Sequence, residues 1–406
     1  MTKVAISTTF FAINIESEPA KAAHEHPNKP ASILMDPPPK SKPPALLPIV
    51  FPPLSNSSFP SRFTLESVPY PSHRRPVQNL VGELRIIDRI RARASPSNAV
   101  RLAIGDDCAI LIPPARHELL VTTDFSLEDR HFRRAWHSPA SIGHRTLARG
   151  LSDLAAMGAT PLAAFLSLAM PKSIARSPRW LDGFLDGLLA LAAAHNVPLA
   201  GGDTAQSPAD LILADIVLLG FAPAGRALRR STARPGDLLY TTGALGGAAA
   251  ELTALSASPR RYRNATPSDN HPHLFPQPRL AVGQSLLRRR LATACIDLSD
   301  GLSTDLAHLC TASNVSAALD LAALPLHPLA AALDDRAQFT ALLHGGEDYE
   351  LLFTASPSTK IPRSIANVPI TQIGRILAPR KNKPQMTILT GADRFELQPH
   401  GWEHFA

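Results

Sequence analysis

Short acidic motifs recur along this chain, and each lies beside glycine or a hydroxyl residue where the backbone is expected to turn. The five motifs are Gly105-Asp106-Asp107, Thr122-Thr123-Asp124, Gly201-Gly202-Asp203-Thr204, Asp297-Leu298-Ser299-Asp300-Gly301 and Gly345-Gly346-Glu347-Asp348-Tyr349-Glu350. A sixth carboxylate, Asp153, lies in a predicted helix. Carboxylates cost free energy away from water unless they are paired or bound to a cation. Such a series indicates hard metal ions held by oxygen ligands, and Mg²⁺ with nucleotide phosphates is the most common case.

Each motif also has an ordinary structural interpretation when it is taken alone. The 105–107 and 345–350 motifs fit solvated turns, Asp124 could end a strand, and Asp300 could be a helix N-cap. The two glycines of the 201–204 motif are more specific, because a residue without Cβ lets a phosphate approach the backbone closely. The metal interpretation therefore depends on the repeated combination of motifs.

Composition limits the class of protein. A chain of 406 residues predicts two to three domains, and 45% hydrophobic with 18% charged residues is ordinary for a soluble α/β protein. The net charge is +7, the arginines are scattered and only 5% of the residues are aromatic. This pattern argues against nucleic-acid binding and weakly favours an anionic substrate.

The cysteines and the apolar segments predict a cytoplasmic protein. Three widely spaced cysteines, Cys108, Cys295 and Cys310, form neither a disulfide framework nor a zinc site, and they predict buried thiols in a reducing compartment. No apolar run approaches the roughly 18 residues of a membrane span. The N-terminus also lacks the pattern of a signal peptide.

Proline and turn residues divide the chain into three regions. Residues 1–75 hold 14 of the 39 prolines without sustained periodicity, which predicts a flexible, dispensable extension. The turn-rich segment 222–236 predicts the boundary between an N-terminal domain, 76–222, and a C-terminal α/β domain, 223–406.

Helices and strands alternate through both domains, which predicts α/β or α+β architecture. Ser138-Pro139 and Ser177-Pro178 predict helix starts, because serine caps the first turn and proline fits its first position. The segment 211–221 shows little alternation, which predicts a strand buried on both faces. The predicted helices span 84–94, 138–157, 178–196, 248–255, 280–290 and 302–311, and 256–278 is predicted as a long surface loop. The predicted strands span 119–123 (ending at Asp124), 211–221, 238–242, 294–298, 316–321 and 349–354, and Leu199 leads into a turn at 201–202.

Several common nucleotide-binding signatures do not occur in the sequence. There is no P-loop pattern and no kinase pair of H-R-D with D-F-G. The glycine turn at 243–247 resembles a dinucleotide loop only loosely, and strand–helix packing explains it better.

Taken in order, the motifs resemble the thiamine-monophosphate kinase family from about residue 81 to the C-terminus. Besides the acidic motifs, the matching stretches are Gly82-Glu83, His131-Phe132, Leu151-Ser152-Asp153-Leu154-Ala155-Ala156-Met157-Gly158, Arg230-Ser231, Arg234-Pro235-Gly236-Asp237 and Gly401-Trp402-Glu403-His404-Phe405. Single motifs also occur in aminoimidazole ribonucleotide synthetase and selenophosphate synthetase. The resemblance implies a two-domain, synthetase-like kinase fold of mixed α/β class. It also implies a homodimer whose N-terminal domains share a β-barrel, with ATP bound near the subunit interface.

The resemblance also implies a role for each matched residue. The residues that look like Mg²⁺ ligands are Asp107, Thr122, Thr123, Asp124, Asp153, Asp203, Asp297 and Asp300. Those that look like ATP contacts are Gly202, Asp203, Arg230 and Ser299, and those that look like contacts to thiamine monophosphate are His131, Glu347 and Trp402. An indole such as that of Trp402 is suited to stack on a cationic thiazolium ring. The segment 127–131, Ala205 and His344 depart from the family's pattern, but none of these departures removes a predicted metal ligand.

The implied reaction transfers the γ-phosphoryl group of ATP to the phosphate of thiamine monophosphate, giving thiamine diphosphate and ADP. The second pKa of a phosphate monoester is near ~6, so the nucleophile is largely anionic at neutral pH and needs no general base. The obstacle is charge repulsion, which several Mg²⁺ ions would offset. Two alternatives stay open at this point: another ATP-dependent synthetase of the superfamily, and a non-catalytic maturation or scaffold protein of the same fold.

Overall fold

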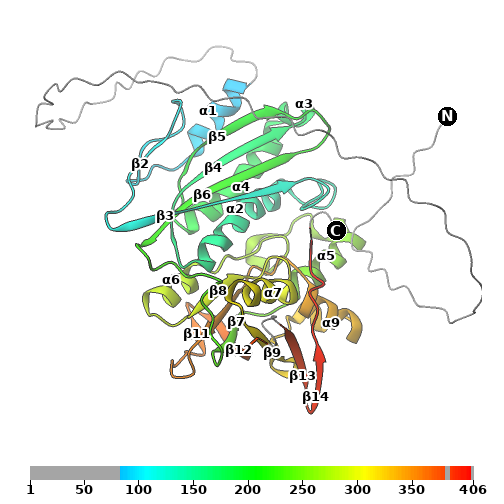
Figure 1. Cartoon of the computed structure of the whole chain (residues 1–406). Helices are drawn as coiled ribbons and strands as arrows, with labels where there is room; N and C mark the ends of the chain where they lie inside the picture. Colours follow the sequence, from blue (N-terminus) through cyan, green and yellow to red (C-terminus); the bar gives the residue numbers. More distant parts are fainter. Residues whose placement is uncertain (1–82, 380–384, 404–406) are drawn as a thin grey trace, which may run out of the picture. The chain divides into compact units, whose positions relative to one another are not determined.

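The computed structural model describes residues 83–379 and 385–403. These residues belong to one compact unit, Arg75–Ala406, in which helices pack against two main sheets (Figure 1). The mixed α/β class predicted from the sequence is therefore confirmed. The predicted extension 1–75 lies outside the described residues, as do Gly82, His404 and Phe405. Within the described ranges, every helix is too short or too polar to cross a bilayer.

The first sheet has four strands in the order β3-β6-β4-β5. Its strands are β3 (His117–Leu127), β4 (Thr160–Met170), β5 (Leu199–Gln206) and β6 (Leu213–Pro223). Strand β6 is antiparallel to both β3 and β4, whereas β5 runs parallel to β4. Helix α2 (Pro139–Ala156) covers one face of this sheet, and α4 (Pro178–Ala194) packs on α2. The short elements nearby are α1 (Glu83–Arg93), β1 (Val100–Leu102), β2 (Ile110–Leu111) and α3 (Lys172–Ala175).

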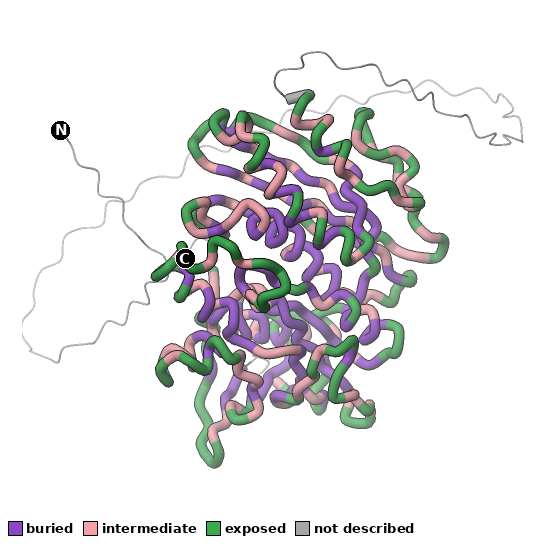
Figure 2. Tube along the Cα trace, turned by 180° about the vertical axis from the view of Figure 1, so that it is seen from behind, coloured by how far each residue is buried: buried purple, intermediate pink, exposed green. Residues whose placement is uncertain are grey.

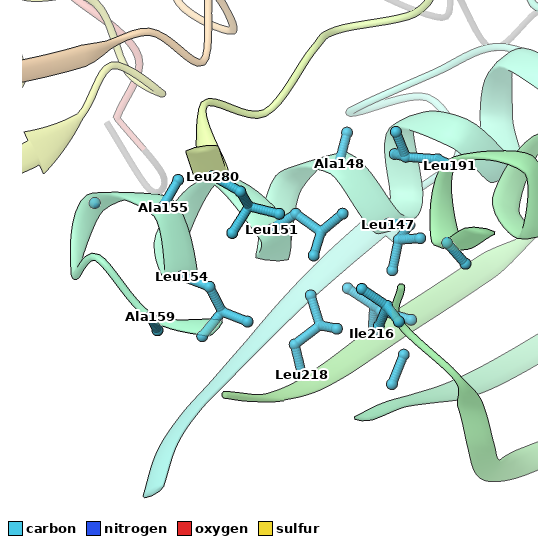
Figure 3. Close-up of a cluster of buried hydrophobic side chains, with 14 of the residues drawn as sticks. Leu147, Ala148, Leu151, Leu154, Ala155, Ala159, Leu191, Ile216, Leu218 and Leu280 are labelled. Atoms are coloured by element: carbon cyan, nitrogen blue, oxygen red, sulfur yellow. The ribbon is translucent and has the colours of Figure 1, made fainter. Parts of the chain in front are cut away.

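Helix α2 forms as the sequence predicts. Ser138 is the N-cap, and its side chain accepts a hydrogen bond from the backbone N–H of Ser141 at 3.1 Å. The apolar stripe of α2 packs on β6, where Leu147, Leu151 and Leu154 face Ile216 and Leu218 (Figure 3). This packing fixes the rotation of α2 about its axis. The polar side chains of α2 therefore lie on a different side of the helix from its leucine stripe.

Helices α2 and α4 approach each other closely because glycine occurs at their contact. A Cβ atom added to Gly187 would lie 1.8 Å from the carbonyl oxygen of Ala140, and one added to Gly143 would lie 1.9 Å from that of Phe184. Real Cβ atoms never approach so closely, so a larger residue at either position would force the two helices apart.

The opposite face of the first sheet is not covered by any helix of the described chain. Burial alternates along β6, which contradicts the predicted strand buried on both faces. The exposed face of β3 carries Leu119, Val121 and Phe125, which are 49%, 63% and 59% exposed. The apolar segment 211–221 predicted a strand buried on both faces, but within one chain only one face of this sheet is covered. Figure 2 shows that buried residues are otherwise gathered inside the unit and exposed ones lie mainly in its loops.

The second sheet follows the order β14-β13-β9-β12-β7-β10-β8, with β11 paired to β12. Its strands are β7 (Leu238–Thr242), β8 (Ala294–Asp297), β9 (Ser316–Asp320), β10 (Leu351–Ala355), β11 (Ser364–Ile365), β12 (Val368–Leu377), β13 (Met386–Thr390) and β14 (Asp393–Glu396). The helices of this half are α5 (Gly247–Ala257), α6 (Leu280–Arg288), α7 (Leu302–Ser313), α8 (Pro328–Ala331) and α9 (Asp335–His344), with short 3₁₀ turns at Pro259–Tyr262, Pro267–Asp269 and Leu321–Ala323. Helix α2 also contacts α6 and β8, so it joins the two sheets.

Two predicted turns are continuous strand in the structure. Strand β3 does not end at Asp124, because Asp124 pairs with Ile216 and the ladder continues to Leu127. Strand β5 likewise runs through the 201–202 glycines, which pair with Phe165 and Leu166 of β4. In both places, hydrogen bonds to the neighbouring strand override the local preference for a turn. Local sequence patterns do not show these long-range partners.

The segment 256–278 is only partly the surface loop that the sequence predicts. His273 is 1% exposed, and Leu274 and Phe275 are buried beside it. The Glu251 carboxylate accepts hydrogen bonds from the backbone N–H groups of His273 at 2.7 Å and Leu274 at 3.3 Å. This carboxylate holds the end of the loop inside the protein, next to α2.

Two of the three cysteines are buried as predicted. Burial raises the pKa of the Cys310 thiol to about 12 and that of Cys295 still further. The prediction is wrong for Cys108, which is exposed in the 105–109 segment.

The buried His144 predicts that the protein loses stability in acid. Its Nε2 donates a hydrogen bond to the Pro276 carbonyl at 2.8 Å, and burial lowers the pKa of His144 to about 4. The pKa of histidine in the unfolded chain is about 6.5. The stability that neutral His144 contributes is therefore complete above that pH and is lost as the pH falls towards the folded pKa. Between pH 7 and 4.5 the wild type should lose about 2 kcal/mol more unfolding free energy than His144→Gln. Urea denaturation at both pH values measures this difference, and equal losses would contradict the assignment.

Candidate active site

Four of the predicted metal ligands converge where α2 lies between the two sheets. Thr122 on β3 donates its hydroxyl to the Asp153 carboxylate on α2. Ser152, the neighbour of Asp153, donates its hydroxyl at 2.7 Å to the carboxylate of Asp297, which ends β8. Alternation along β3 sends Asp124 to the same face as Thr122, towards α2. The packing of α2 therefore assembles carboxylates from three separate motifs.

The electrostatics of this cluster suit a divalent cation. Burial, together with repulsion from Asp124, raises the pKa of Asp153. Burial, together with repulsion from Asp153 and Asp305, raises the pKa of Asp297 well above its usual range. Neighbouring carboxylates that repel one another in a partly dehydrated site are a good set of hard ligands for Mg²⁺. Asp124, Asp153 and Asp297 are the residues that would hold such an ion.

Arg149 lies beside this cluster, one turn of α2 before Asp153. Its Nε and Nη2 lie 3.0 and 2.7 Å from the same oxygen, Oδ1 of Asp124. Its Nη1 lies 3.5 Å from Oε1 of Glu347 and 3.3 Å from the hydroxyl of Tyr349. The guanidinium thus spans the distance between a predicted metal ligand and a predicted substrate contact.

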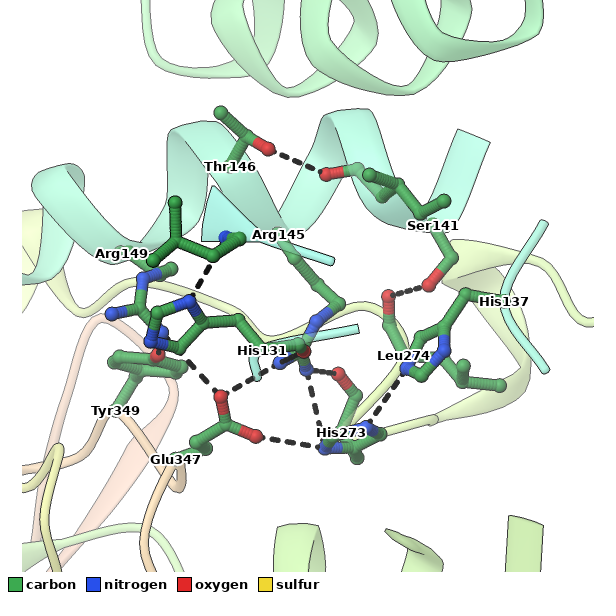
Figure 4. A network of polar contacts seen from close by, with 12 residues as sticks. His131, His137, Ser141, Arg145, Thr146, Arg149, His273, Leu274, Glu347 and Tyr349 are labelled. Atoms are coloured by element: carbon green, nitrogen blue, oxygen red, sulfur yellow. Dashed lines mark hydrogen bonds and ion pairs between the residues drawn. The ribbon is translucent and has the colours of Figure 1, made fainter. Parts of the chain in front are cut away.

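Glu347 is the centre of a buried polar network (Figure 4). Its Oε1 accepts a hydrogen bond from Arg145 Nη2 at 2.7 Å, and its Oε2 lies 3.0 Å from Nδ1 of His273. Arg145 also donates to the His131 carbonyl at 3.0 Å. Burial acts to raise the pKa of Glu347, but Arg145, His273 and Arg149 outweigh it and hold that pKa well below its usual range. Glu347 is therefore a carboxylate, and the network places His131 close to it.

Backbone hydrogen bonds bring the segments around Ser299, Glu347 and Trp402 together. The N–H of Glu347 donates to the Ser299 carbonyl at 2.8 Å, and the N–H of Trp402 donates to the Asp300 carbonyl at 3.0 Å. The predicted nucleotide contact Ser299 and the predicted substrate contacts Glu347 and Trp402 consequently lie around one short segment.

Arg230 and Asp300 lie at the edge of this region. Arg230 is exposed, and its charge slightly opposes the rise in the pKa of Asp153 and of Asp297, so it lies within electrostatic range of the cluster. Asp300 groups with Asp305 and His308, and ligand atoms of the three lie within 4.8 Å of one another.

The structure does not bring every predicted ligand into this cluster. Asp107 is exposed in the 105–109 segment, and the Thr123 side chain lies on the face of β3 opposite to Asp124. Gly202 and Asp203 lie on β5, at the opposite edge of the sheet from β3. With strands about 4.8 Å apart and two strands between them, Asp203 is roughly 14 Å from Asp124 across the sheet of one chain.

Three participants were not predicted from the sequence: Arg145, Arg149 and His273. One signal was available, because Arg145, Arg149 and Asp153 follow each other at four-residue spacing and so share one face of α2. No comparable spacing pattern pointed to His273, because it lies in the polar segment 256–278 that was predicted to be a surface loop.

The fold and the site define a class of protein. Two consecutive family models match the chain: the N-terminal domain of AIR synthase related proteins over residues 105–222, and the C-terminal domain over residues 234–382. The boundary expected between 222 and 223 lies at the end of the first match, and it stays a prediction.

Relatives narrow this class to one family. Thiamine-monophosphate kinase of Salmonella typhimurium is 40% identical over 307 residues, which are 73% of this chain and 91% of that protein. The chain belongs to the thiamine-monophosphate kinase family. The crystal structure of thiamine-monophosphate kinase from Stenotrophomonas maltophilia is 37% identical, has a TM-score of 0.66 and aligns over 75% of this chain and 96% of its own. The structure of AaThiL complexed with AMPPCP and TMP is 25% identical, has a TM-score of 0.62 and aligns over 82% and 100%.

Proposed function

We propose that this protein transfers the γ-phosphoryl group of ATP to thiamine monophosphate, giving thiamine diphosphate and ADP. The observation that carries the proposal is the single cluster in which Asp124, Asp153 and Asp297 lie beside Glu347. Three predicted metal ligands thereby lie next to a predicted substrate contact. Membership of the family and the AaThiL structure with AMPPCP and TMP support the same reaction.

The site's own groups explain how such a transfer can proceed without a general base. The acceptor phosphate is already largely anionic at neutral pH, because its second pKa is near ~6. Bound Mg²⁺ would supply positive charge that lets the two phosphate groups approach each other. We expect direct transfer, because no residue needs to act as an intermediate phosphate carrier in this arrangement.

Each predicted site residue keeps its role as a proposal. The proposed metal ligands are Asp107, Thr122, Thr123, Asp124, Asp153, Asp203, Asp297 and Asp300. The proposed ATP contacts are Gly202, Asp203, Arg230 and Ser299, and the proposed contacts to thiamine monophosphate are His131, Glu347 and Trp402. A cytoplasmic location also stays a prediction.

The proposal is tested by incubating the purified protein with ATP, Mg²⁺ and thiamine monophosphate and separating the products by chromatography. We expect thiamine diphosphate from the wild type and almost none from Asp124→Ala. If the wild type binds ATP but forms no product, the activity belongs to a sister synthetase or the protein is a scaffold. A radioactive protein recovered after mixing with γ-labelled ATP would contradict direct transfer.

We further propose that the protein is a homodimer whose interface is formed by the first sheet of each copy. The uncovered face of β3 exposes Leu119, Val121 and Phe125, an apolar patch of the kind that marks an interface. The four-stranded sheet also ends in β3 on one edge and β5 on the other, so the sheets of two copies would close into one barrel of eight strands. Pairing β3 of one copy with β5 of the other would bring Asp203 of one chain towards Asp124 of the other. This arrangement explains why Asp203 lies apart from the cluster in a single chain.

Val121→Glu is the variant that tests the dimer, because it places a charge on the most exposed of the three apolar residues. Sedimentation at micromolar concentration should give the wild type twice the 43.5 kDa of one chain and give the variant one chain mass. We expect the variant to lose most of its kinase activity if Asp203 acts across the interface. A monomeric wild type would contradict the proposal.

A further inference from the structure

Arg149 is a cation at a position where the proposed reaction needs one. The phosphate of thiamine monophosphate carries nearly two negative charges at neutral pH. In the proposed reaction this phosphate lies between two places. One is the carboxylate cluster, where ATP is expected to react, and the other is Glu347, where the thiamine group is expected to bind. Arg149 contacts Asp124 of the cluster on one side. On the other side it contacts Glu347, and these two residues are labelled in Figure 4.

The guanidinium can accept a phosphate without giving up its anchor. Arg149 uses Nε and Nη2 on Oδ1 of Asp124, which leaves Oδ2 of Asp124 to bind a metal ion. The contacts of Nη1 to Glu347 at 3.5 Å and to Tyr349 at 3.3 Å are long. Long hydrogen bonds are weak, so a phosphate oxygen can replace them at small cost.

The neighbouring arginine does not fit the same role. The Arg145 side chain is only 3% exposed, and it donates to the carbonyls of His131 and His273 as well as to Glu347. Arg145 therefore holds the network together. The Arg149 side chain is 14% exposed, so it is more accessible than that of Arg145.

From this geometry we propose that Arg149 binds the phosphate of the acceptor and so selects thiamine monophosphate over thiamine. The inference rests on the proposed function, because it assigns a residue to the acceptor of that reaction. Arg149 is then a specificity-determining residue that recognises the phosphate group. Glu347 and Trp402 would bind the thiamine group.

The test compares two ligands in the full-length protein by isothermal titration calorimetry: thiamine monophosphate and thiamine. In Arg149→Met the affinity for thiamine monophosphate should fall about tenfold to a hundredfold, the value of a charge-assisted hydrogen bond. The affinity for thiamine should change little. The KM for thiamine monophosphate should rise while the KM for ATP stays unchanged. Arg179→Met, which removes an exposed arginine of α4, is the matched control and should bind both ligands like the wild type.

The outcomes separate the inference from the proposed function. If the affinities for both ligands fall equally in Arg149→Met, the residue only supports the fold of the site, and the inference is overturned. If the wild type forms thiamine diphosphate and Arg149→Met keeps its preference for the phosphorylated ligand, the function stands and the inference fails. A wild type that forms no product overturns the function itself. Should Arg149→Met not fold, Arg149→Lys carries the test, because it keeps the charge and should show a smaller loss in the same direction.

Discussion

Asp124→Asn is expected to lower the rate of thiamine diphosphate formation by about a thousandfold while leaving the fold intact. The amide oxygen of asparagine can still accept the two hydrogen bonds that Arg149 makes to Oδ1. The substitution removes a negative charge from the proposed metal site, where a bound Mg²⁺ would contribute several kcal/mol to phosphoryl transfer. A loss of about 4 kcal/mol corresponds to that thousandfold change in rate.

Initial rates at saturating ATP and at rising Mg²⁺ concentration measure this effect. We expect the variant to need more Mg²⁺ for half-maximal rate, since its site has lost one charged ligand. Asp129→Asn is the control, because Asp129 lies just beyond β3, is exposed, and has a positive φ of 65° that asparagine tolerates. A rate for Asp124→Asn within tenfold of the wild type would exclude Asp124 as a metal ligand.

Glu347→Gln is expected to destabilise the protein by about 3–5 kcal/mol, the usual cost of removing one partner from a buried ion pair. Glutamine has nearly the same shape as glutamate, but it leaves the buried Arg145 without a full negative charge. His273 would also lose its charged partner. Affinity for thiamine monophosphate should fall as well, because Glu347 is a proposed contact to that substrate.

Urea denaturation followed by circular dichroism measures the stability change at several pH values. The folded pKa of Glu347 lies below its unfolded value, so its contribution is complete above about pH 5 and is lost as the pH falls. The gap between wild type and variant should therefore narrow in acid. Asp186→Asn is the control, because the ion pair between Asp186 and Arg93 is at the surface and such pairs contribute less than about 1 kcal/mol. A similarly small loss for Glu347→Gln would contradict the buried network.

Local signals predicted many of the elements of this fold. The cap at Ser138, the proline after it and the leucine stripe predicted α2 nearly to its ends, because each of these signals acts within one turn of helix. The strands β7 and β8 were predicted from short apolar runs in the same way. The failures came where pairing partners decide the outcome. Asp124 and the 201–202 glycines lie within strands because neighbouring strands supply hydrogen bonds that no local pattern records.

The sequence by itself determined which chemical groups are available: carboxylates beside glycines in a family-specific order, and an aromatic tail. Only the tertiary structure decided which of these groups meet. Asp124, Asp153 and Asp297 come together because α2 packs between two sheets, whereas Asp203 lies at the far edge of the first sheet. The structure also decided that Arg149 lies between Asp124 and Glu347, residues that are far apart in the chain. The physical reason is that residue types and local spacing are written along the chain, whereas long-range proximity depends on how buried apolar surfaces fit together.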